Sequence, residues 1–145
     1  MKKTVFNRFS ILLFLALCAL TAACSKDKST PTPELTAEEL ILGKWYIVKI
    51  SKADGSIYEP ANDCEKESHY RLDDENEIDL VNFYLDDGEC KRSGGWGEYY
   101  LIDDGTKLII TASDGVTSTI DVIKLNESTM ELKIGGDTLY LKKGG

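Results

Sequence analysis

Hydrophobic and polar residues alternate along much of the chain from residue 44 onward, as in strands with one buried face. Residues 129–134 (TMELKI) and 77–80 (EIDL) show this period of two. Other segments are rich in Trp, Tyr, Ile and Val, which favour pleated sheets. Eight short strands are predicted, at residues 44–51, 68–73, 77–85, 95–102, 106–112, 116–125, 128–134 and 138–143.

Turn signals separate most of these strands. They are Asp54-Gly55, Asp87-Gly88, Asp104-Gly105, Asp114-Gly115 and Gly135-Gly136, and tight hairpins need residues of this kind, which tolerate positive φ. Strands joined in order by short turns predict an all-β fold. We expect an antiparallel up-and-down barrel of eight strands, because closure removes the exposed edges of a sheet. An open sandwich is the alternative.

One short helix, about residues 37–42, is predicted before the first strand. Thr36 and Glu39 fit a capping box, as its N-cap and N3 residues. Gly43 can end the helix in the left-handed conformation.

The first 23 residues have the composition of a secretory signal peptide. Basic residues precede an apolar run over 9–20, and small residues follow up to Cys24. The apolar run is too short to cross a bilayer, which takes about 20 residues. The sequence from Leu20 to Cys24 resembles a bacterial lipobox, which implies that Cys24 is lipidated and begins the mature chain. A secreted protein without lipid is the alternative.

The chain is therefore predicted to have three parts. Residues 1–23 form the signal peptide, and residues 24–36 form the lipidated N-terminus and a polar, Pro-containing linker. Residues 37–145 have the size of one small domain and form the barrel.

The charge of the mature chain excludes one class of partner. Without the three basic residues of the signal peptide, 14 basic side chains face 25 acidic ones, a net charge of −11. Such a surface repels nucleic acid.

Two cysteines, Cys64 and Cys90, remain once Cys18 has left with the signal peptide and Cys24 carries lipid. An even number of cysteines in an oxidising compartment predicts a disulfide. The alternative is a metal site with His69 as a third ligand, but structural zinc needs four close ligands and this spacing is wide.

The order of these features resembles that of the lipocalin-like domain lipoproteins of Gram-negative bacteria. Gly43-Lys44-Trp45, where the predicted helix meets the first strand, resembles the Gly-x-Trp motif of lipocalins, and Gly94-Gly95-Trp96 resembles a repeat of it. A lipobox, a short linker and the two cysteines complete the likeness. The resemblance implies a lipocalin-like barrel in which Trp45 packs across the closed end.

Aromatic residues are the candidate ligand-binding groups. They are Trp45, Tyr70, Phe83, Trp96 and Tyr100. Trp45 and Trp96 are expected in the barrel core, or else at the floor of a pocket. Trp96 and its aromatic neighbours beside glycines have another interpretation, an aromatic surface for a sugar or a partner.

No catalytic or metal site and no cofactor are predicted. His69 is the only histidine, no serine lies in a G-x-S-x-G elbow, and no phosphate-binding loop follows a strand. The acidic segments 73–75, 86–89 and 103–105 do not match a calcium loop and are expected to be solvated turns.

The sequence thus predicts a membrane-anchored, non-enzymatic lipocalin-like lipoprotein of the cell envelope, most readily of the outer membrane. Its expected partner is a small apolar ligand or another envelope protein. The alternative is a structural or adhesive surface module with a filled barrel and no small-molecule ligand.

Overall fold

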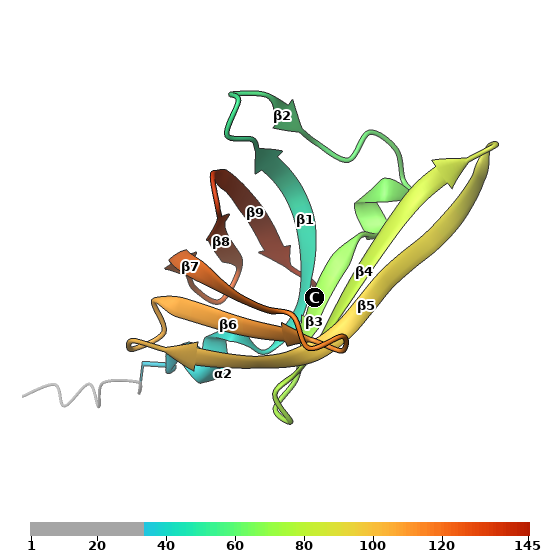
Figure 1. Ribbon diagram of the computed structural model, residues 1–145. Coiled ribbons are helices and arrows are strands. Elements are labelled where there is room, and N and C mark those ends of the chain that lie inside the picture. Colours follow the sequence, from blue (N-terminus) through green and yellow to red (C-terminus); the bar gives the residue numbers. More distant parts are fainter. Residues whose placement is uncertain (1–33) are drawn as a thin grey trace, which may run out of the picture. The chain divides into compact units, whose positions relative to one another are not determined.

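The structure, a computed structural model, describes residues 34–145 (Figure 1). This part of the chain holds helix α2 (Ala37–Ile41), a 3-10 turn η1 (Glu65–Glu67) and nine strands. The strands are β1 (Gly43–Ser51), β2 (Ile57–Tyr58), β3 (His69–Leu72), β4 (Glu77–Asp86), β5 (Glu89–Ile102), β6 (Lys107–Ala112), β7 (Thr117–Leu125), β8 (Thr129–Ile134) and β9 (Asp137–Lys143).

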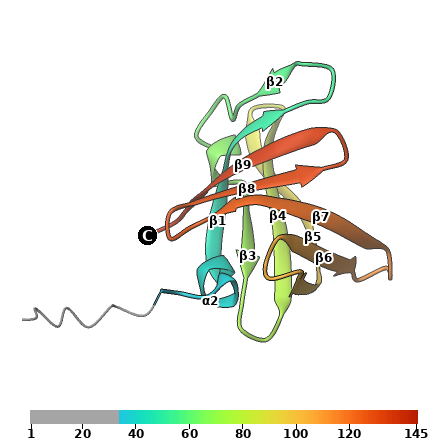
Figure 2. The same cartoon turned by 90° about the vertical axis from the view of Figure 1, so that its left-hand side faces the viewer.

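Eight of these strands, β1 and β3 to β9, form a closed antiparallel barrel. Each pairs with the next along the ring, and β9 pairs with β1 to close it, with Ile47 opposite Leu141. The lower half of β1 pairs with β3, and its last two residues pair with the short strand β2 (Figure 2). The predicted barrel is confirmed, and an open sandwich is excluded.

The predicted helix is confirmed and is one residue shorter than expected. Its capping box is complete, because Glu39 N donates to Thr36 Oγ1 (3.3 Å) and Thr36 N donates to Glu39 Oε2 (2.8 Å). Leu42 is already extended. Gly43 does adopt a positive φ, 117°, but as the first residue of β1 rather than as the end of the helix.

The core fills the barrel with side chains from α2 and from all eight strands of the ring. Its buried members are Ile41, Trp45, Leu72, Ile78, Tyr99, Leu108, Ile110, Ile120, Met130, Leu132, Leu139 and Leu141. Alternation along each strand sends these residues inward and their neighbours outward.

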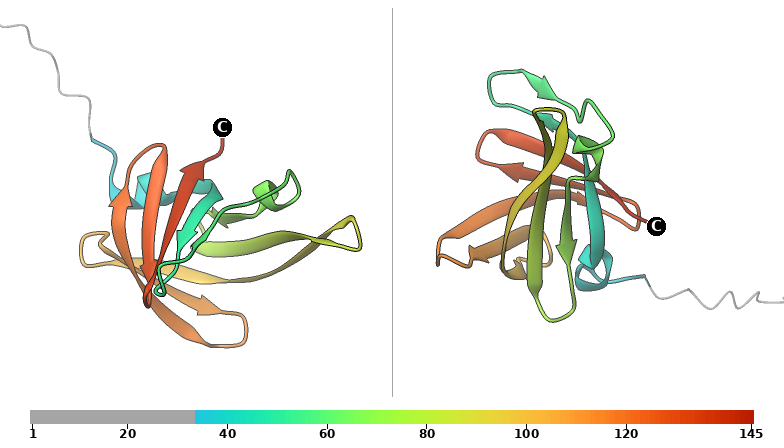
Figure 3. Two further views of the ribbon diagram at one scale, coloured as in Figure 1. Left: turned by 90° about the horizontal axis from the view of Figure 1, so that it is seen from above. Right: turned by 90° about the vertical axis from the view of Figure 1, so that its right-hand side faces the viewer.

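The hairpin of β4 and β5 is longer than predicted and projects away from the rest of the barrel (Figure 3). β5 begins at Glu89, whereas the sequence predicts a strand from residue 95. Its first residues are polar and show no apolar alternation, so they give no strand signal. They pair with β4 because Asp87 and Gly88 form a tight turn with positive φ (52° and 81°), which sets the register of the ladder.

Candidate functional site

One end of the barrel is closed by Trp45, which is completely buried. Its indole Nε1 donates to Ile41 O (2.7 Å), the last carbonyl of α2. From β9, Lys143 Nζ lies 5.0 Å from the centre of the Trp45 ring and donates to Leu40 O (2.9 Å). The helix, the first strand and the last strand therefore meet at one indole.

At the open end, apolar side chains remain partly exposed on the inner face. Tyr84 in β4 and Ile134 in β8 continue the inward series that contains Ile78 and Met130. β4 and β8 stand on opposite sides of the ring, and both side chains are 39% exposed. A side chain added at Gly95, which also faces inward, would meet no atom within 4 Å. The mouth of the barrel therefore presents apolar surface beside unfilled space.

Polar groups share the inner face of the mouth. Asn82 and Ser93 face each other across the β4–β5 ladder, and Tyr84 faces Lys91. The ammonium of Lys91 pairs with the carboxylate of Asp86 near the tip of the hairpin. The mouth thus offers hydrogen-bond donors and acceptors next to its apolar side chains.

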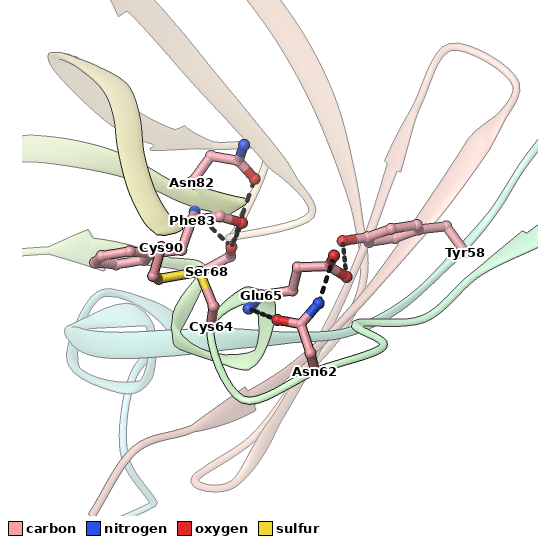
Figure 4. The surroundings of a disulfide bond; sticks show 8 residues. All are labelled: Tyr58, Asn62, Cys64, Glu65, Ser68, Asn82, Phe83 and Cys90. Carbon is pink, nitrogen blue, oxygen red and sulfur yellow. Dashed lines mark hydrogen bonds between the residues drawn. A yellow bond between two sulfur atoms is a disulfide. The ribbon is translucent and has the colours of Figure 1, made fainter. Parts of the chain in front are cut away.

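A disulfide joins the loop after β2 to the β4–β5 hairpin, which forms one wall of the mouth (Figure 4). Cys64 is bonded to Cys90, with their Cα atoms 5.7 Å apart, so the predicted disulfide is confirmed. Ser68, 2% exposed, adds a non-covalent link, because Phe83 N donates to its Oγ (2.8 Å). The serine hydroxyl therefore accepts the hydrogen bond that a backbone carbonyl of a neighbouring strand would otherwise accept from Phe83 N.

The carboxylate of Glu65 organises the same loop. It accepts hydrogen bonds from Ala61 N (2.9 Å) and Asn62 Nδ2 (2.8 Å), and Glu65 N in turn donates to Asn62 Oδ1 (2.9 Å). The bonds from Ala61 and Asn62 hold the pKa of Glu65 below its ordinary value. Burial and the nearby Glu65 charge raise the pKa of Tyr58.

The five predicted ligand residues do not line one surface. Trp45 and Tyr70 are cross-strand neighbours inside the barrel, where burial raises the pKa of Tyr70. Phe83, Trp96 and Tyr100 face outward. Trp96 is 59% exposed, so the expectation that it lies in the core is wrong. Whether any of the five binds a ligand stays a prediction.

The outward position of Trp96 follows from the pleat of β5. Tyr99 is buried in the core, so Trp96, three positions before it, must face the opposite side of the strand. Residues Gly95 and Gly97 occupy the inward positions on either side of Trp96. Because glycine has no apolar side chain, the sequence shows no apolar alternation that would mark these positions as inward.

His69 lies between two aromatic rings on the outer face, not in a catalytic arrangement. Its ring centre is 5.6 Å from that of Tyr46 and 6.4 Å from that of Phe83, and Nδ1 lies 2.6 Å from Glu67 O. Among residues 34–145, no group of three or more His, Cys, Asp or Glu side chains is placed to hold a metal ion.

The acidic turns are held by their own side chains. Asp73 Oδ1 accepts from Glu75 N and Glu77 N, and Asp114 Oδ1 accepts from Val116 N. These carboxylates therefore stabilise hairpin turns of the barrel.

A model of the lipocalin-like domain family matches residues 41–132. The chain belongs to this family.

Its lipocalin-like fold is shared by two solved structures from Bacteroides. A lipocalin-like protein from Bacteroides uniformis ATCC 8492 is 19% identical, with a TM-score of 0.55 over 71% of this chain and 97% of that one. An uncharacterized protein from Bacteroides eggerthii DSM 20697 is 16% identical, with a TM-score of 0.54 over 71% and 98%. At these sequence identities, the likeness to the two structures shows the fold alone. The comparison with curated proteins found no significant match.

The predicted signal peptide and lipidation site of this lipocalin-like chain lie outside the described residues. Within residues 34–145, no helix is long and apolar enough to cross a bilayer.

Proposed function

We propose that the protein is a membrane-anchored, non-enzymatic lipocalin-like lipoprotein that binds a small, mainly apolar ligand at the mouth of its barrel. The observation that carries the proposal is the pair Tyr84 and Ile134. They face inward from opposite sides of the ring, and each keeps over a third of its surface exposed. Binding sites for small molecules combine such apolar walls with a few polar groups.

The filled core sets the depth of this site. Trp45, Tyr99 and the other core side chains fill the interior below the mouth, so the ligand is held near the rim. A ligand with an apolar body and one polar end fits best, because Asn82 and Ser93 lie beside the apolar side chains. Small barrels of eight strands have room for one such ligand.

A binding role is also favoured over catalysis. Members of the lipocalin-like family are generally binding proteins, and the single imidazole, His69, lies tilted between two aromatic rings on the outer face. It has no neighbouring nucleophile or acid in a concave site among the contacts of residues 34–145.

The mouth can be tested with N-phenyl-1-naphthylamine, an uncharged apolar probe whose fluorescence rises in apolar surroundings. We expect saturable binding by the purified protein, weakened several-fold by Tyr84→Ala and by Ile134→Ala. The matched controls Tyr100→Ala and Ile123→Ala remove exposed side chains elsewhere on the barrel and should leave binding unchanged. Absence of saturable binding, or equal effects of all four variants, would reject a ligand site at the mouth.

Anchoring is proposed from the lipobox-like sequence before Cys24. Mass analysis of the mature N-terminus should find Cys24 as the first residue, carrying acyl chains, and Cys24→Ser should release the protein from membranes. We place the protein in the cell envelope, most readily at the outer membrane. A free thiol at the mature N-terminus would reject anchoring.

The second candidate function is a structural or adhesive surface module. Trp96 and Tyr100 favour this second function, because their side chains are exposed on the outer face and are not part of the core. It predicts that the mouth variants leave the function unchanged and that changes to the outer face abolish it.

A further inference from the structure

A second candidate site lies at the β4–β5 ladder. Five of its eight lining residues face outward, and the other three, Leu80, Ser93 and Gly95, face inward. The site is a hollow of about 440 Å³, lined only by residues of these two strands, 79–81 and 92–96. This volume lies at the small end of the range for small-molecule sites, which is about 300–1,000 Å³. Alternation places Asp79, Val81, Arg92 and Trp96 on the outward face, opposite to Ile78 and Tyr99.

The hollow exists because two neighbouring outward positions carry little side chain. Gly94 lies between Arg92 and Trp96 on the outer face of β5. A Cβ at Gly94 would fall 2.0 Å from Leu80 O, so no larger residue fits there without movement of β4. Opposite Gly94, the small side chain of Val81 is 7% exposed and forms the floor.

Trp96 forms one wall and offers a broad apolar platform. Its side chain is 59% exposed. Its backbone is fixed on both sides, since Trp96 pairs with Asp79 in β4 and its carbonyl accepts from Ser113 N (3.0 Å). An exposed indole on a rigid strand costs little conformational entropy when it binds a ligand.

The polar groups around the platform comprise both donors and acceptors. Asp79 Oδ2 accepts two hydrogen bonds from Arg71 (2.7 and 3.0 Å), whereas Asp79 Oδ1 accepts none from the described part of the chain. Arg92 forms no ion pair within residues 34–145, so its five N–H groups remain available. Because Arg71 already neutralises Asp79, the unpaired charge of the hollow is that of Arg92, which disfavours a cationic ligand.

From this combination we infer that the hollow binds a neutral saccharide, stacked on Trp96. The C–H face of a pyranose ring is apolar and matches the face of the indole. Its hydroxyls both donate and accept, which matches the carboxylate of Asp79 and the guanidinium of Arg92. A nucleotide is disfavoured by the acidic surface of the protein, and a cation over the indole is disfavoured by Arg92.

The chain contains its own reporter and internal control. Trp96 and the fully buried Trp45 are its only tryptophans, so their two indole N–H signals can be followed by NMR in the purified full-length protein. Cellobiose, maltose and N,N′-diacetylchitobiose are the probes. We expect at least one of them to shift the Trp96 signal saturably and to leave the Trp45 signal in place.

Variants separate this site from the mouth. Trp96→Ala should weaken saccharide binding about tenfold or more, as truncation of a central aromatic contact does, with the backbone amides of Gly94 and Gly95 as the readout. Tyr100→Ala, which removes the next exposed aromatic side chain of β5, and Tyr84→Ala at the mouth should leave it unchanged.

Three results would overturn the inference. They are no saturable shift with any of the three sugars, binding that survives Trp96→Ala, and a Trp96 shift produced by tetramethylammonium or adenosine but not by the sugars. The last result would assign the hollow to a cation or a base. The mouth is tested separately by the effects of Tyr84→Ala and Ile134→Ala on the apolar probe, and neither of these residues lines the hollow.

Discussion

The ammonium of Lys143 lies over the indole ring of Trp45, although 97 residues separate them in the sequence. The same ammonium donates to Leu40 O at the end of α2. One side chain near the C-terminus therefore holds the helix and the first strand together at the closed end of the barrel. A cation over tryptophan and a charge-assisted hydrogen bond each stabilise such a junction.

Replacement of Lys143 should loosen this end. We expect Lys143→Met to lower the free energy of unfolding by about 1–2 kcal/mol, since it removes both contacts but keeps an apolar stem. Lys143→Arg keeps the positive charge and should lose less. Lys142→Met, at the exposed neighbouring position, is the control. Urea unfolding midpoints measure all three, and equal effects at positions 142 and 143 would contradict the role given to Lys143.

The glycines of β5 should respond differently to the same substitution. Gly94→Ala places a methyl group 2.0 Å from Leu80 O, so β4 must shift, and we expect a loss of about 1–3 kcal/mol. Gly95→Ala meets no atom within 4 Å and should change stability by less than about 0.5 kcal/mol. Thermal unfolding measures the stability of the two variants. Equal losses of stability would show that the close approach of Gly94 to Leu80 O does not restrict the residue at position 94.

Reduction of Cys64–Cys90 should lower the melting temperature without unfolding the protein. On the chain-entropy model, a closed loop of this length contributes roughly 3–4 kcal/mol. The core and the ladder of β4 and β5 remain when the bridge is lost, so the reduced protein should keep its circular dichroism spectrum at room temperature. A Cys64→Ser/Cys90→Ser variant is the control, since reductant should no longer change its melting temperature.

The loop after β2 should loosen in acid through Glu65. Its hydrogen bonds lower the pKa of Glu65 in the folded protein below the ordinary 4.5. The stabilisation is therefore complete above pH 4.5 and is lost as the pH falls through the lower, folded pKa. Amide exchange at Ala61, whose N–H donates to Glu65, should accelerate over this range. In Glu65→Gln the exchange rate, corrected for its intrinsic pH dependence, should no longer change there.

The buried hydroxyl of Ser68 should matter more than its position in a loop suggests. Ser68→Ala leaves the part-buried Phe83 N–H without its partner, which costs about 1–3 kcal/mol. Ser113→Ala, at an exposed position, is a control that should be nearly neutral. Urea unfolding measures the difference, and a neutral Ser68→Ala would mean that water replaces the hydroxyl.

Apolar alternation in two segments, β-favouring residues in the others and the turn signals between them were together enough to predict all eight strands of the barrel. These signals could not predict residues 89–94 of β5, which extend past the core and have no buried face to mark. The capping box at Thr36 was also predictable, since both of its hydrogen bonds are local in sequence.

The contact between Lys143 and Trp45 and the outward orientation of Trp96 were not predictable in the same way. Lys143 reaches Trp45 only because β9 closes the ring beside β1, and a single lysine carries no sign of such a contact. For Trp96 the core was expected and the exposed aromatic surface was only the alternative, because tryptophan is usually buried and the inward neighbours of Trp96 are glycines. The register of β5 relative to the buried Tyr99 would have revealed the exposure of Trp96.

The disulfide also changes the outcome of proteolytic cleavage between Cys64 and Cys90. Residues 64 to 90 form a covalent ring that contains η1, β3, β4 and the turn at Asp73–Asn76 between the two strands. A protease that cleaves this exposed turn breaks one peptide bond but releases no fragment. A molecule nicked at this turn would therefore keep every strand of its barrel covalently attached to the rest of the chain, including the proposed anchor at Cys24.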